Sequence, residues 1–399
     1  MQICNRFQHS VEGIFQAMKI ERNFAMRTTM IWALVFAATL LTISPAKAET
    51  YGRTGFHIDW WDSDTGDDGF QYHIPIEAGG DYKNVYFKIL TAYAYSEIDP
   101  DNADSRSFDG FVDTKVNLAY EVIEQLPVNL LFALDFNLPT GKTGLAAADA
   151  ISIADPDKVT ITRMGEGTNV NPSISVLKQW GSLYTAVGLG YIWRGSFDAA
   201  DTLVDYDPGD ALNIAAAMDY LFTPRWSGRL FGSWTRFEKD QLAGVDYYKP
   251  GDVTIFGASA TYARAVWDVT AIVKAILRDK DERQNSSGVL QPESENYFGD
   301  EWIAELKGHM QINDWMDLNA WAQYLTIDEN EYATTDPFYL SDRKKTLFGC
   351  ELAGRINKHW EAGVSLQWYI MNVDSNPSNA LAGSDFDGGS ATLWLTAHF

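Results

Sequence analysis

The chain ends in FDGGSATLWLTAHF, residues 386–399. Counting back by twos from Phe399, the next residues are all apolar: Ala397, Leu395, Leu393 and Ala391. An alternation with a period of two is typical of a β-strand whose two faces meet different surroundings. Soluble domains usually end in a polar, frayed tail. An alternating strand that stops on an aromatic residue therefore predicts a closing strand with one face in an apolar medium.

The same period of two recurs along the chain from Tyr51 onward. Within 359–372, for example, Trp360 and Trp368 fall on an apolar face, and Glu361 and Gln367 fall on the opposite face. Tryptophans at both ends of an apolar face are typical of strands that cross a lipid bilayer. Sixteen such segments are centred near residues 56, 74, 90, 114, 133, 175, 189, 216, 232, 258, 272, 305, 322, 350, 366 and 393.

The connections between these segments alternate in length. Tight turns are expected at 79–82, 123–126, 181–182, 223–224, 265, 313–314 and 358. Long connections include 139–168, 196–209, 279–297 and 329–342. Short periplasmic turns that alternate with long extracellular loops are typical of bacterial outer-membrane barrels. The sequence therefore predicts an all-β fold, a transmembrane antiparallel up-and-down β-barrel of about 16 strands, with 14 or 12 strands as alternatives.

The first 48 residues are expected to lie outside this barrel. From Met26 the chain has a basic Arg27, an apolar run over 31–43 and the small-residue pattern Ala46-Lys47-Ala48. These are the parts of a secretory signal peptide cleaved after Ala48; an anchoring helix is the alternative, but the run is short for one. Residues 1–48 are thus predicted to be an upstream extension with a signal, and residues 49–399 a single transmembrane β-barrel.

The chain carries a net charge of -23 at pH 7. A nucleic-acid partner is excluded, because binding a phosphate backbone requires clustered Lys and Arg. The acidic excess falls mainly in the long connections, for example Asp62, Asp64, Asp67 and Asp68 in the first of them, between the segments near 56 and 74. One acidic run offers weak calcium candidates, Asp62, Asp64 and Asp67, but it lacks the closing Glu of a calcium-binding loop. A solvated acidic loop is the main interpretation, and bridging by divalent cations to lipopolysaccharide phosphates is the alternative. No other metal site and no cofactor is predicted.

The face opposite the apolar one is assigned to the lumen. It carries acids and bases in nearly equal number, which indicates a polar wall of mixed sign. A water-filled barrel interior tolerates such charges, whereas a dry core does not. Trp321 on this face is interpreted either as wall packing or as part of an apolar track for a solute. The lumen-lining candidates are Asp113, Lys115, Asp135, Arg229, Lys274, Glu305, Lys307, Trp321, Glu351 and Arg355.

Two adjacent strands give the strongest motif. The sequence FDGFVDTKVNLAYEV, residues 108–122, is followed after a turn by PVNLLFALDFNLPTGK, residues 127–142. On the first strand, Val112, Thr114 and Val116 are expected to face lipid. An apolar strand that ends in LPTGK resembles the outer-membrane barrels of the MetA-pathway of phenol degradation family. That resemblance implies a porin-like barrel and the uptake of aromatic or other hydrophobic compounds.

Enzymatic interpretations find little support in the sequence. The tripeptide Gly-Lys-Thr at 141–143 lacks the earlier glycine of a phosphate-binding loop. The histidines are scattered over different segments, with no zinc-protease or hydrolase spacing. The protein is therefore predicted not to be an enzyme.

The predicted function is an outer-membrane channel for the passive uptake of small solutes, with the connection 139–168 as its candidate constriction. The alternative is a non-transporting structural or surface-interaction barrel with a packed lumen. The expected location is the bacterial outer membrane. The expected partners are outer-membrane lipid and lipopolysaccharide, a small-molecule solute, and the barrel assembly machinery, for which Phe399 resembles the terminal recognition signal.

Overall fold

The structure is a computed structural model that describes residues 49–123, 127–146, 155–375 and 383–399. The predicted signal segment, 1–48, lies outside these residues, as does most of the apolar stretch within the connection 139–168. The described residues form β-strands, turns and loops, and no α-helix occurs among them. Over these same ranges, no helix has the length and apolar character needed to cross a membrane.

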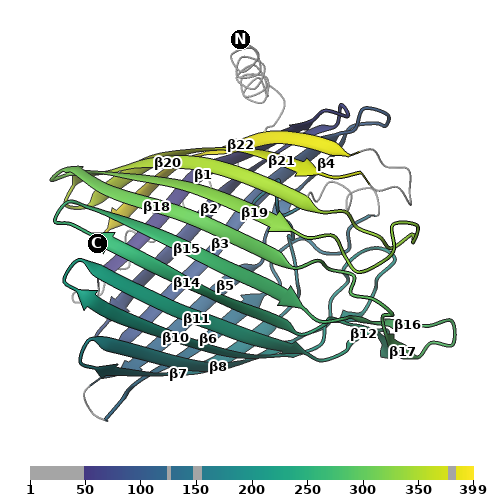
Figure 1. The fold of residues 1–399 in the computed structure, drawn as a ribbon, viewed down its shortest axis with the longest axis horizontal. Helices are drawn as coiled ribbons and strands as arrows, with labels where there is room; N and C mark the ends of the chain where they lie inside the picture. Colours follow the sequence, from purple (N-terminus) through teal and green to yellow (C-terminus); the bar gives the residue numbers. More distant parts are fainter. Residues whose placement is uncertain (1–48, 124–126, 147–154, 376–382) are drawn as a thin grey trace. The chain divides into compact units, whose positions relative to one another are not determined.

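The barrel consists of antiparallel strands that follow one another around the wall in chain order (Figure 1). Its strands are β1 (Glu49–Ser63), β2 (Asp68–Tyr82), β3 (Val85–Asp99), β4 (Arg106–Phe111), β5 (Thr114–Val122), β6 (Asn129–Leu138), β7 (Asn169–Trp180), β8 (Leu183–Arg194), β10 (Ala211–Thr223), β11 (Trp226–Phe237), β14 (Val253–Ala263), β15 (Trp267–Arg278), β18 (Glu301–Asn313), β19 (Met316–Ile327), β20 (Arg343–Asn357), β21 (Trp360–Val373) and β22 (Ser384–His398).

The first and last strands close the sheet on itself. β1 pairs with β22 in an antiparallel register that runs from Tyr51 opposite His398 to Ser63 opposite Phe386. β4 and β5 both pair with β3 and form one interrupted strand, so the wall has sixteen strands. Each predicted segment coincides with one of them, and the predicted fold class is confirmed. A closed sheet leaves no unpaired edge.

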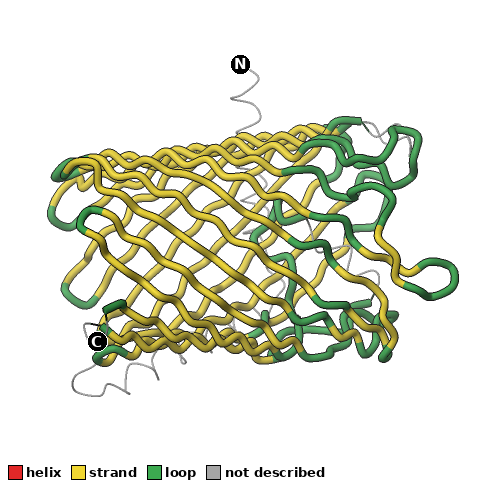
Figure 2. The backbone as a smooth tube through the Cα atoms, turned by 60° about the horizontal axis from the view of Figure 1, so that its bottom comes forward, coloured by secondary structure: helices red, strands yellow, loops and turns green. Residues whose placement is uncertain are grey.

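Tight turns lie at one end of the barrel and long connections lie at the other (Figure 2). The first tight turn lies at Lys83 and Asn84, with Lys83 in a left-handed conformation at φ 57°, and not at 79–82, where β2 continues. The connection between β1 and β2 was expected to be long, but it spans only 64–67. Asp62 and Asp68, which were assigned to that loop, lie in the strands and face each other in the register.

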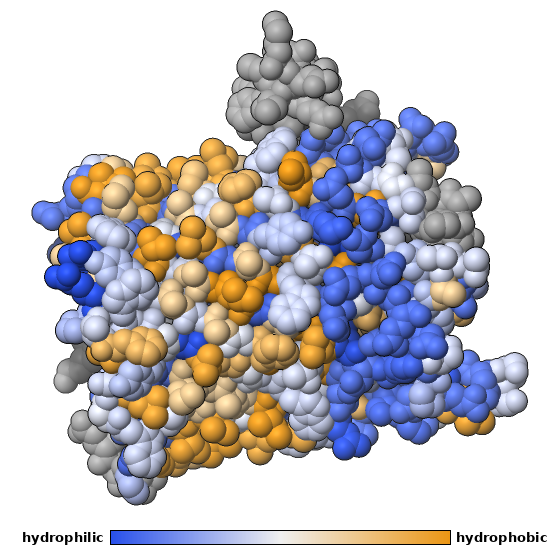
Figure 3. Space-filling model, viewed as in Figure 1, coloured by the Kyte–Doolittle hydropathy of each residue, from blue (hydrophilic) through white to orange (hydrophobic). Residues whose placement is uncertain are grey.

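The outer face of the barrel is apolar across its middle. Large side chains there are more than half exposed, as in Val187, Leu230, Phe348, Leu366 and Leu393. Figure 3 shows apolar side chains gathered over the strands and polar side chains gathered at the end with long connections. A soluble barrel would have to bury such a belt, whereas a lipid-facing wall requires one.

Exposed aromatic side chains border this belt at the end with tight turns. They are Tyr82, Trp180, Phe222, Trp226, Trp267 and Trp315, and each lies in or beside a turn between two strands. Trp and Tyr rings prefer the interface between lipid and water. The apolar belt and its aromatic border are the features of a transmembrane barrel.

The long connections build a second, smaller sheet beyond the barrel rim. It contains β9 (Tyr206–Asp207), β12 (Asp240–Leu242), β13 (Val245–Lys249), β16 (Glu282–Gln284) and β17 (Leu290–Pro292). Two buried aspartates support it in the same way. Asp240 accepts hydrogen bonds from the Tyr206 hydroxyl and the Gly209 N–H, and Asp281 accepts them from the Tyr248 hydroxyl and the Gly251 N–H. These repeated contacts hold the loops together above the rim.

Candidate functional site: the lumen and its inserted loop

Asp113 holds both ends of the connection 139–168, which we name the inserted loop. One carboxylate oxygen accepts the N–H of Gly141 at 2.8 Å. The other accepts the N–H of Glu166 at 2.7 Å and Nδ2 of Asn137 at 2.6 Å. Asp113 is only 4% exposed. Because Gly141 and Glu166 come from opposite ends of the connection, one buried carboxylate closes it into a loop with a narrow neck.

A β-bulge between β4 and β5 directs Asp113 inward. Tyr93 of β3 pairs with Phe111 and Leu90 pairs with Lys115, so three residues on this strand face two on β3. Such an extra residue bends a strand and redirects a side chain. Val112 turns inward as well and packs against a buried cluster formed with residues of the inserted loop. The prediction that Val112 faces lipid was wrong for this reason.

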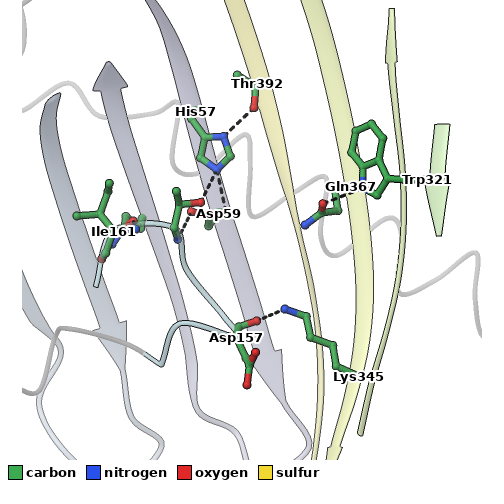
Figure 4. A network of polar contacts seen from close by, with 10 residues as sticks. His57, Asp59, Asp157, Ile161, Trp321, Lys345, Gln367 and Thr392 are labelled. Carbon is green, nitrogen blue, oxygen red and sulfur yellow. Dashed lines mark hydrogen bonds and ion pairs between the residues drawn. The ribbon is translucent and has the colours of Figure 1, made fainter. Parts of the chain in front are cut away.

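Residues 160 and 161 of the inserted loop lie against the inner face of β1 and β2. Asp59 of β1 accepts the N–H of Thr160 at 2.9 Å. The Gln71 side chain of β2 accepts the N–H of Ile161 at 2.7 Å and donates to the Ile161 carbonyl at 2.8 Å. Figure 4 shows this contact between the loop and the wall. The Gln71 side chain therefore bonds both the N–H and the carbonyl of Ile161, as the backbone of a neighbouring strand would.

A second set of contacts attaches the loop to β20 and β21. Arg343 Nη1 lies 2.6 Å from carboxylate oxygens of both Asp155 and Asp157, and Lys345 Nζ donates to the Asp157 carbonyl. Val159 is buried in an apolar cluster with wall residues on β1, β20 and β21: Trp61, Leu347, Tyr369 and Met371. The described part of the loop is thus held by polar and apolar contacts on one side of the lumen.

Lys158, a residue of the inserted loop, holds its charge over two aromatic rings. Its Nζ is 4.1 Å from the centroid of the Trp61 ring and 3.6 Å from that of Phe386. Burial lowers the pKa of Lys158 from 10.5 to about 8, although Asp155 nearby acts in the opposite direction. Near neutral pH, Lys158 is therefore still protonated in most molecules, although burial disfavours its charged form.

This lowered pKa gives a prediction of pH dependence. Between about pH 8 and pH 10.5 the unfolded chain holds the Lys158 proton more tightly than the folded chain, so the free energy of unfolding rises with pH. We expect the unfolding temperature in detergent to rise from pH 7.5 to pH 10 relative to that of Lys158→Met. If the unfolding temperatures of the two proteins changed in parallel with pH, the lowered pKa of Lys158 would be contradicted.

The wall opposite the inserted loop is lined by small side chains. A cavity of about 690 Å³ lies against β7 to β15. Its lining includes Ser175, Gly188, Ala215, Ala217, Ser233 and Ser259. A second cavity, of about 550 Å³, continues from it past Thr270 to β18 and β19. The loop therefore occupies one side of the lumen, and small residues leave space along the other.

Ionisable side chains of this open side are partly paired, and most of them are about half exposed. Arg229 lies 3.5 Å from Asp219, and both side chains are about half exposed. Lys307 lies 3.1 Å from Glu305 on the same strand. His309 lies 3.3 Å from Asp268 and 3.4 Å from Asp317. Half-exposed ions on the inner face indicate that water fills this space, because a dry core would bury them at high cost.

The other predicted lumen residues occupy separate places along the wall. Lys115 lines a cavity beneath the inserted loop together with Asp113. Asp135 accepts hydrogen bonds from the side chains of Asn117 and Asn171 on the neighbouring strands. Lys274 on β15 is half-buried beside Gly257. Among the contacts of the described residues, Asp113 is the lumen-lining candidate whose side chain accepts hydrogen bonds from the inserted loop.

Two tryptophans of the lumen lie flat across glycines. Trp321 crosses Gly349 on the next strand, and its Nε1 donates to Gln367 one strand further at 3.1 Å. Trp394 crosses Gly363 in the same manner and donates to Glu351 at 3.1 Å. A Cβ on Gly349 would lie 2.2 Å from the Trp321 ring. These contacts fit the wall-packing interpretation of Trp321.

The remaining predicted residues lie near the two rims. Arg355, close to the tight turns, is 63% exposed at its side chain and lies 3.5 Å from Glu361. At the other rim, Asp64 accepts the N–H of Asp385, and Asp67 accepts the N–H of Asp101. These two calcium candidates thus contact different neighbouring hairpins, while Asp62 faces Asp68 in the register of β1 and β2.

Several functional side chains were not among the predicted candidates. Asp59, Gln71 and Arg343 hold the loop, but their strands show only ordinary alternation in the sequence. His57 and His73 were interpreted as scattered, yet the register of β1 and β2 places them opposite each other. The pairing could have been predicted from the sequence, because His57 and His73 are equally far along the chain from Thr65 in the turn between β1 and β2.

Comparison with solved structures finds outer-membrane proteins of low sequence identity. Acinetobacter baumannii OccAB1 is 11% identical, with 88% of this chain and 96% of that chain covered and a TM-score of 0.44. A loop L8 deletion mutant of OmpT, an outer membrane protein of Vibrio cholerae, is 12% identical, with 87% and 99% covered and a TM-score of 0.37. A triple mutant of the Rh. blastica porin is 12% identical, with 88% and 99% covered and a TM-score of 0.32.

At these identities and TM-scores, the neighbours assign no function to this chain. No protein-family model and no curated protein matches the chain. The predicted membership of the MetA-pathway of phenol degradation family, based on the LPTGK stretch, therefore stays a prediction.

Proposed function

We propose that this protein is a channel of the bacterial outer membrane through which small solutes diffuse passively. The observation that carries the proposal is the asymmetry of the lumen. The inserted loop is fixed to β1, β2, β20 and β21, whereas the opposite wall has small side chains and half-exposed ions. A sixteen-stranded barrel is wide enough to hold an aqueous channel. The loop then narrows the channel without filling it.

Cations are the ions expected to pass more readily. The chain carries a net charge of -23, and many of its acids lie in the long connections at one end of the barrel. A mouth of negative sign raises the local concentration of cations and lowers that of anions. The wall itself is mixed, because pairs such as Arg229 and Asp219 balance each other. The preference therefore arises at the entrance and is expected to weaken at high salt.

For uncharged solutes we propose aromatic or other hydrophobic compounds as the favoured class. The support is the LPTGK resemblance together with two aromatic rings that line the open side: Phe231 in the larger cavity, and Trp321, which is packed on the wall, in the second cavity. In the same proposal, outer-membrane lipid and lipopolysaccharide surround the barrel, and the assembly machinery recognises the strand that ends at Phe399.

Single-channel recording in planar bilayers tests the proposal. Folded protein is first verified by its altered gel migration before and after heating. We expect stable unitary current steps in KCl and, under a KCl gradient, a reversal potential of the sign for cation preference. A folded protein that stays silent would overturn the channel and support the packed-lumen alternative. A reversal potential of the opposite sign would overturn the cation preference alone.

A further inference from the structure

Three potential metal ligands converge where the inserted loop meets β1 and β2. His57 and Asp59 face the lumen from β1, and His73 lies opposite His57 on β2. One donor atom of each residue can be chosen so that all three atoms lie within 4.8 Å of one another. In the described ranges, no other three or more His, Cys, Asp and Glu side chains gather in this way.

One nitrogen atom of this group is left without a hydrogen-bond partner among the described residues. His57 Nε2 lies 2.9 Å from Asp59 Oδ1, and the rings of His57 and His73 lie with their centroids 4.5 Å apart and their planes tilted by 32°. His73 is 7% exposed, and its Nδ1 is buried with no hydrogen-bond partner in the part of the chain that the structure describes. A buried polar atom without a partner costs free energy. A cation shared with the neighbouring imidazole and carboxylate removes that cost.

The surroundings orient the ligands as the outer contacts of known metal sites do. The other nitrogen of His57, Nδ1, lies 2.7 Å from Thr392 Oγ1 on β22 (Figure 4). Ligating imidazoles usually make such a contact through the nitrogen that does not bind the metal. From the loop side, Thr160 Oγ1 lies 3.1 Å from His57 Nε2. The Thr160 hydroxyl is therefore placed to complete the coordination or to bind a water molecule on the ion.

An ion can reach this group from the lumen. His73 and Thr160 line a cavity of about 380 Å³ beneath the inserted loop. Asp59 and Thr160 line a neighbouring cavity of about 190 Å³ on the other side. The group therefore lies between two spaces that water can fill, with the loop residue Thr160 common to both.

We propose that His57, Asp59 and His73 bind a divalent transition-metal ion, for which Zn²⁺ is the best-fitting probe. Two imidazoles and one carboxylate, with an open fourth position, match the donors that Zn²⁺ takes in proteins. Ca²⁺ and Mg²⁺ prefer sets made of oxygen alone. The ion binds the unprotonated Nε2 of His57, and the single proton of the neutral ring then lies on Nδ1, where Thr392 Oγ1 accepts it. Because Asp59 also holds Thr160, the bound ion fastens the inserted loop to the wall, whether or not the barrel conducts.

The test is a calorimetric titration of ZnCl₂ into the folded full chain in detergent micelles. We expect one zinc ion per chain bound through this group, with affinity lowered at least about tenfold in Asp59→Asn and in His73→Gln. Thr392→Val, which removes only the outer contact, is expected to weaken binding by about tenfold. His309→Gln is the matched control, since His309 also contacts two acids in the lumen but lacks a second histidine.

Cobalt supplies a second measurement that does not depend on the variants' folding. CoCl₂ added to the unmodified chain should give the intense visible absorption of four-coordinate cobalt, and ZnCl₂ should displace it. The proposal is overturned if the folded chain binds no zinc and gives no such spectrum. It is also overturned if His309→Gln weakens binding while folded Asp59→Asn and Thr392→Val bind as the unmodified chain does.

Discussion

Replacing Asp113 by alanine is expected to release the inserted loop from the barrel wall. The free energy needed to detach the loop should fall by about 3 kcal/mol. Three donors point at this one buried carboxylate: Gly141 N, Glu166 N and Asn137 Nδ2. The variant leaves the N–H groups of Gly141 and Glu166 without this acceptor in a place that is nearly inaccessible to water, while Asn137 Nδ2 keeps only the Gly167 carbonyl. Limited proteolysis of folded protein in detergent, followed by mass spectrometry, should show cleavage within 139–168 that is much faster than in the unmodified chain.

Asp135→Ala is the matched control for this experiment. Asp135 lies on the neighbouring strand and also accepts hydrogen bonds from two side-chain amides, those of Asn117 and Asn171. Both of these partners belong to barrel strands, so its removal should lower the unfolding temperature without speeding cleavage of the loop. Equal cleavage rates for Asp113→Ala and the unmodified chain would show that Asp113 does not hold the loop.

Excision of the loop beyond its neck is expected to raise the single-channel conductance several-fold. The neck makes the excision feasible, because Gly165 packs against Lys142 and Thr143. A Cβ on Gly165 would lie 2.5 Å from Thr143 Cγ2 and 3.0 Å from the Lys142 carbonyl oxygen. Residues 145–163 can therefore be removed and Gly144 joined to Met164, which keeps the contacts of Asp113. The conductance rises because ions can then also pass through the side of the lumen that the loop occupies in the unmodified chain.

The control for the excision is a deletion elsewhere at the same end of the barrel. The β16–β17 hairpin, whose turn includes Gly288, belongs to the outer sheet and lies away from the loop contacts. Removal of its tip, 286–288, should leave the conductance unchanged. If the excised protein folds and conducts as the unmodified chain does, the inserted loop is not the constriction.

The strand pattern was predictable because lipid on one side and water on the other impose the same alternation on each strand. The segment around Leu393 and the segment around Val364 illustrate this, since each keeps its apolar residues on the exposed face. Turn positions were predicted less well. Residues 79–82 have the small and polar composition of a turn, but the sheet continues through them until Lys83, which adopts the left-handed conformation.

The contacts of the lumen were harder to predict, because they depend on register. Asp62 and Asp68 face each other across β1 and β2, an arrangement of like charges that usually destabilises a sheet. The run of acidic residues over 62–68 therefore indicated a loop. With a loop of that length, the register that pairs His57 with His73 could not be recognised. The inward turn of Val112 also had no signal in the sequence, because a bulge shifts the alternation by one residue without changing composition.

The seam between β1 and β22 has a consequence for how the protein is made. The bond between His57 and Thr392 joins residues 335 positions apart, and Phe399 N–H donates to the Thr50 carbonyl at the very end of the seam. Contacts between such distant residues form slowly, because nearly the whole chain must be ordered before they are gained. Until then both seam strands expose unpaired backbone groups, which lipid cannot satisfy. Completion of the wall is therefore expected to be the late, rate-limiting event of its folding.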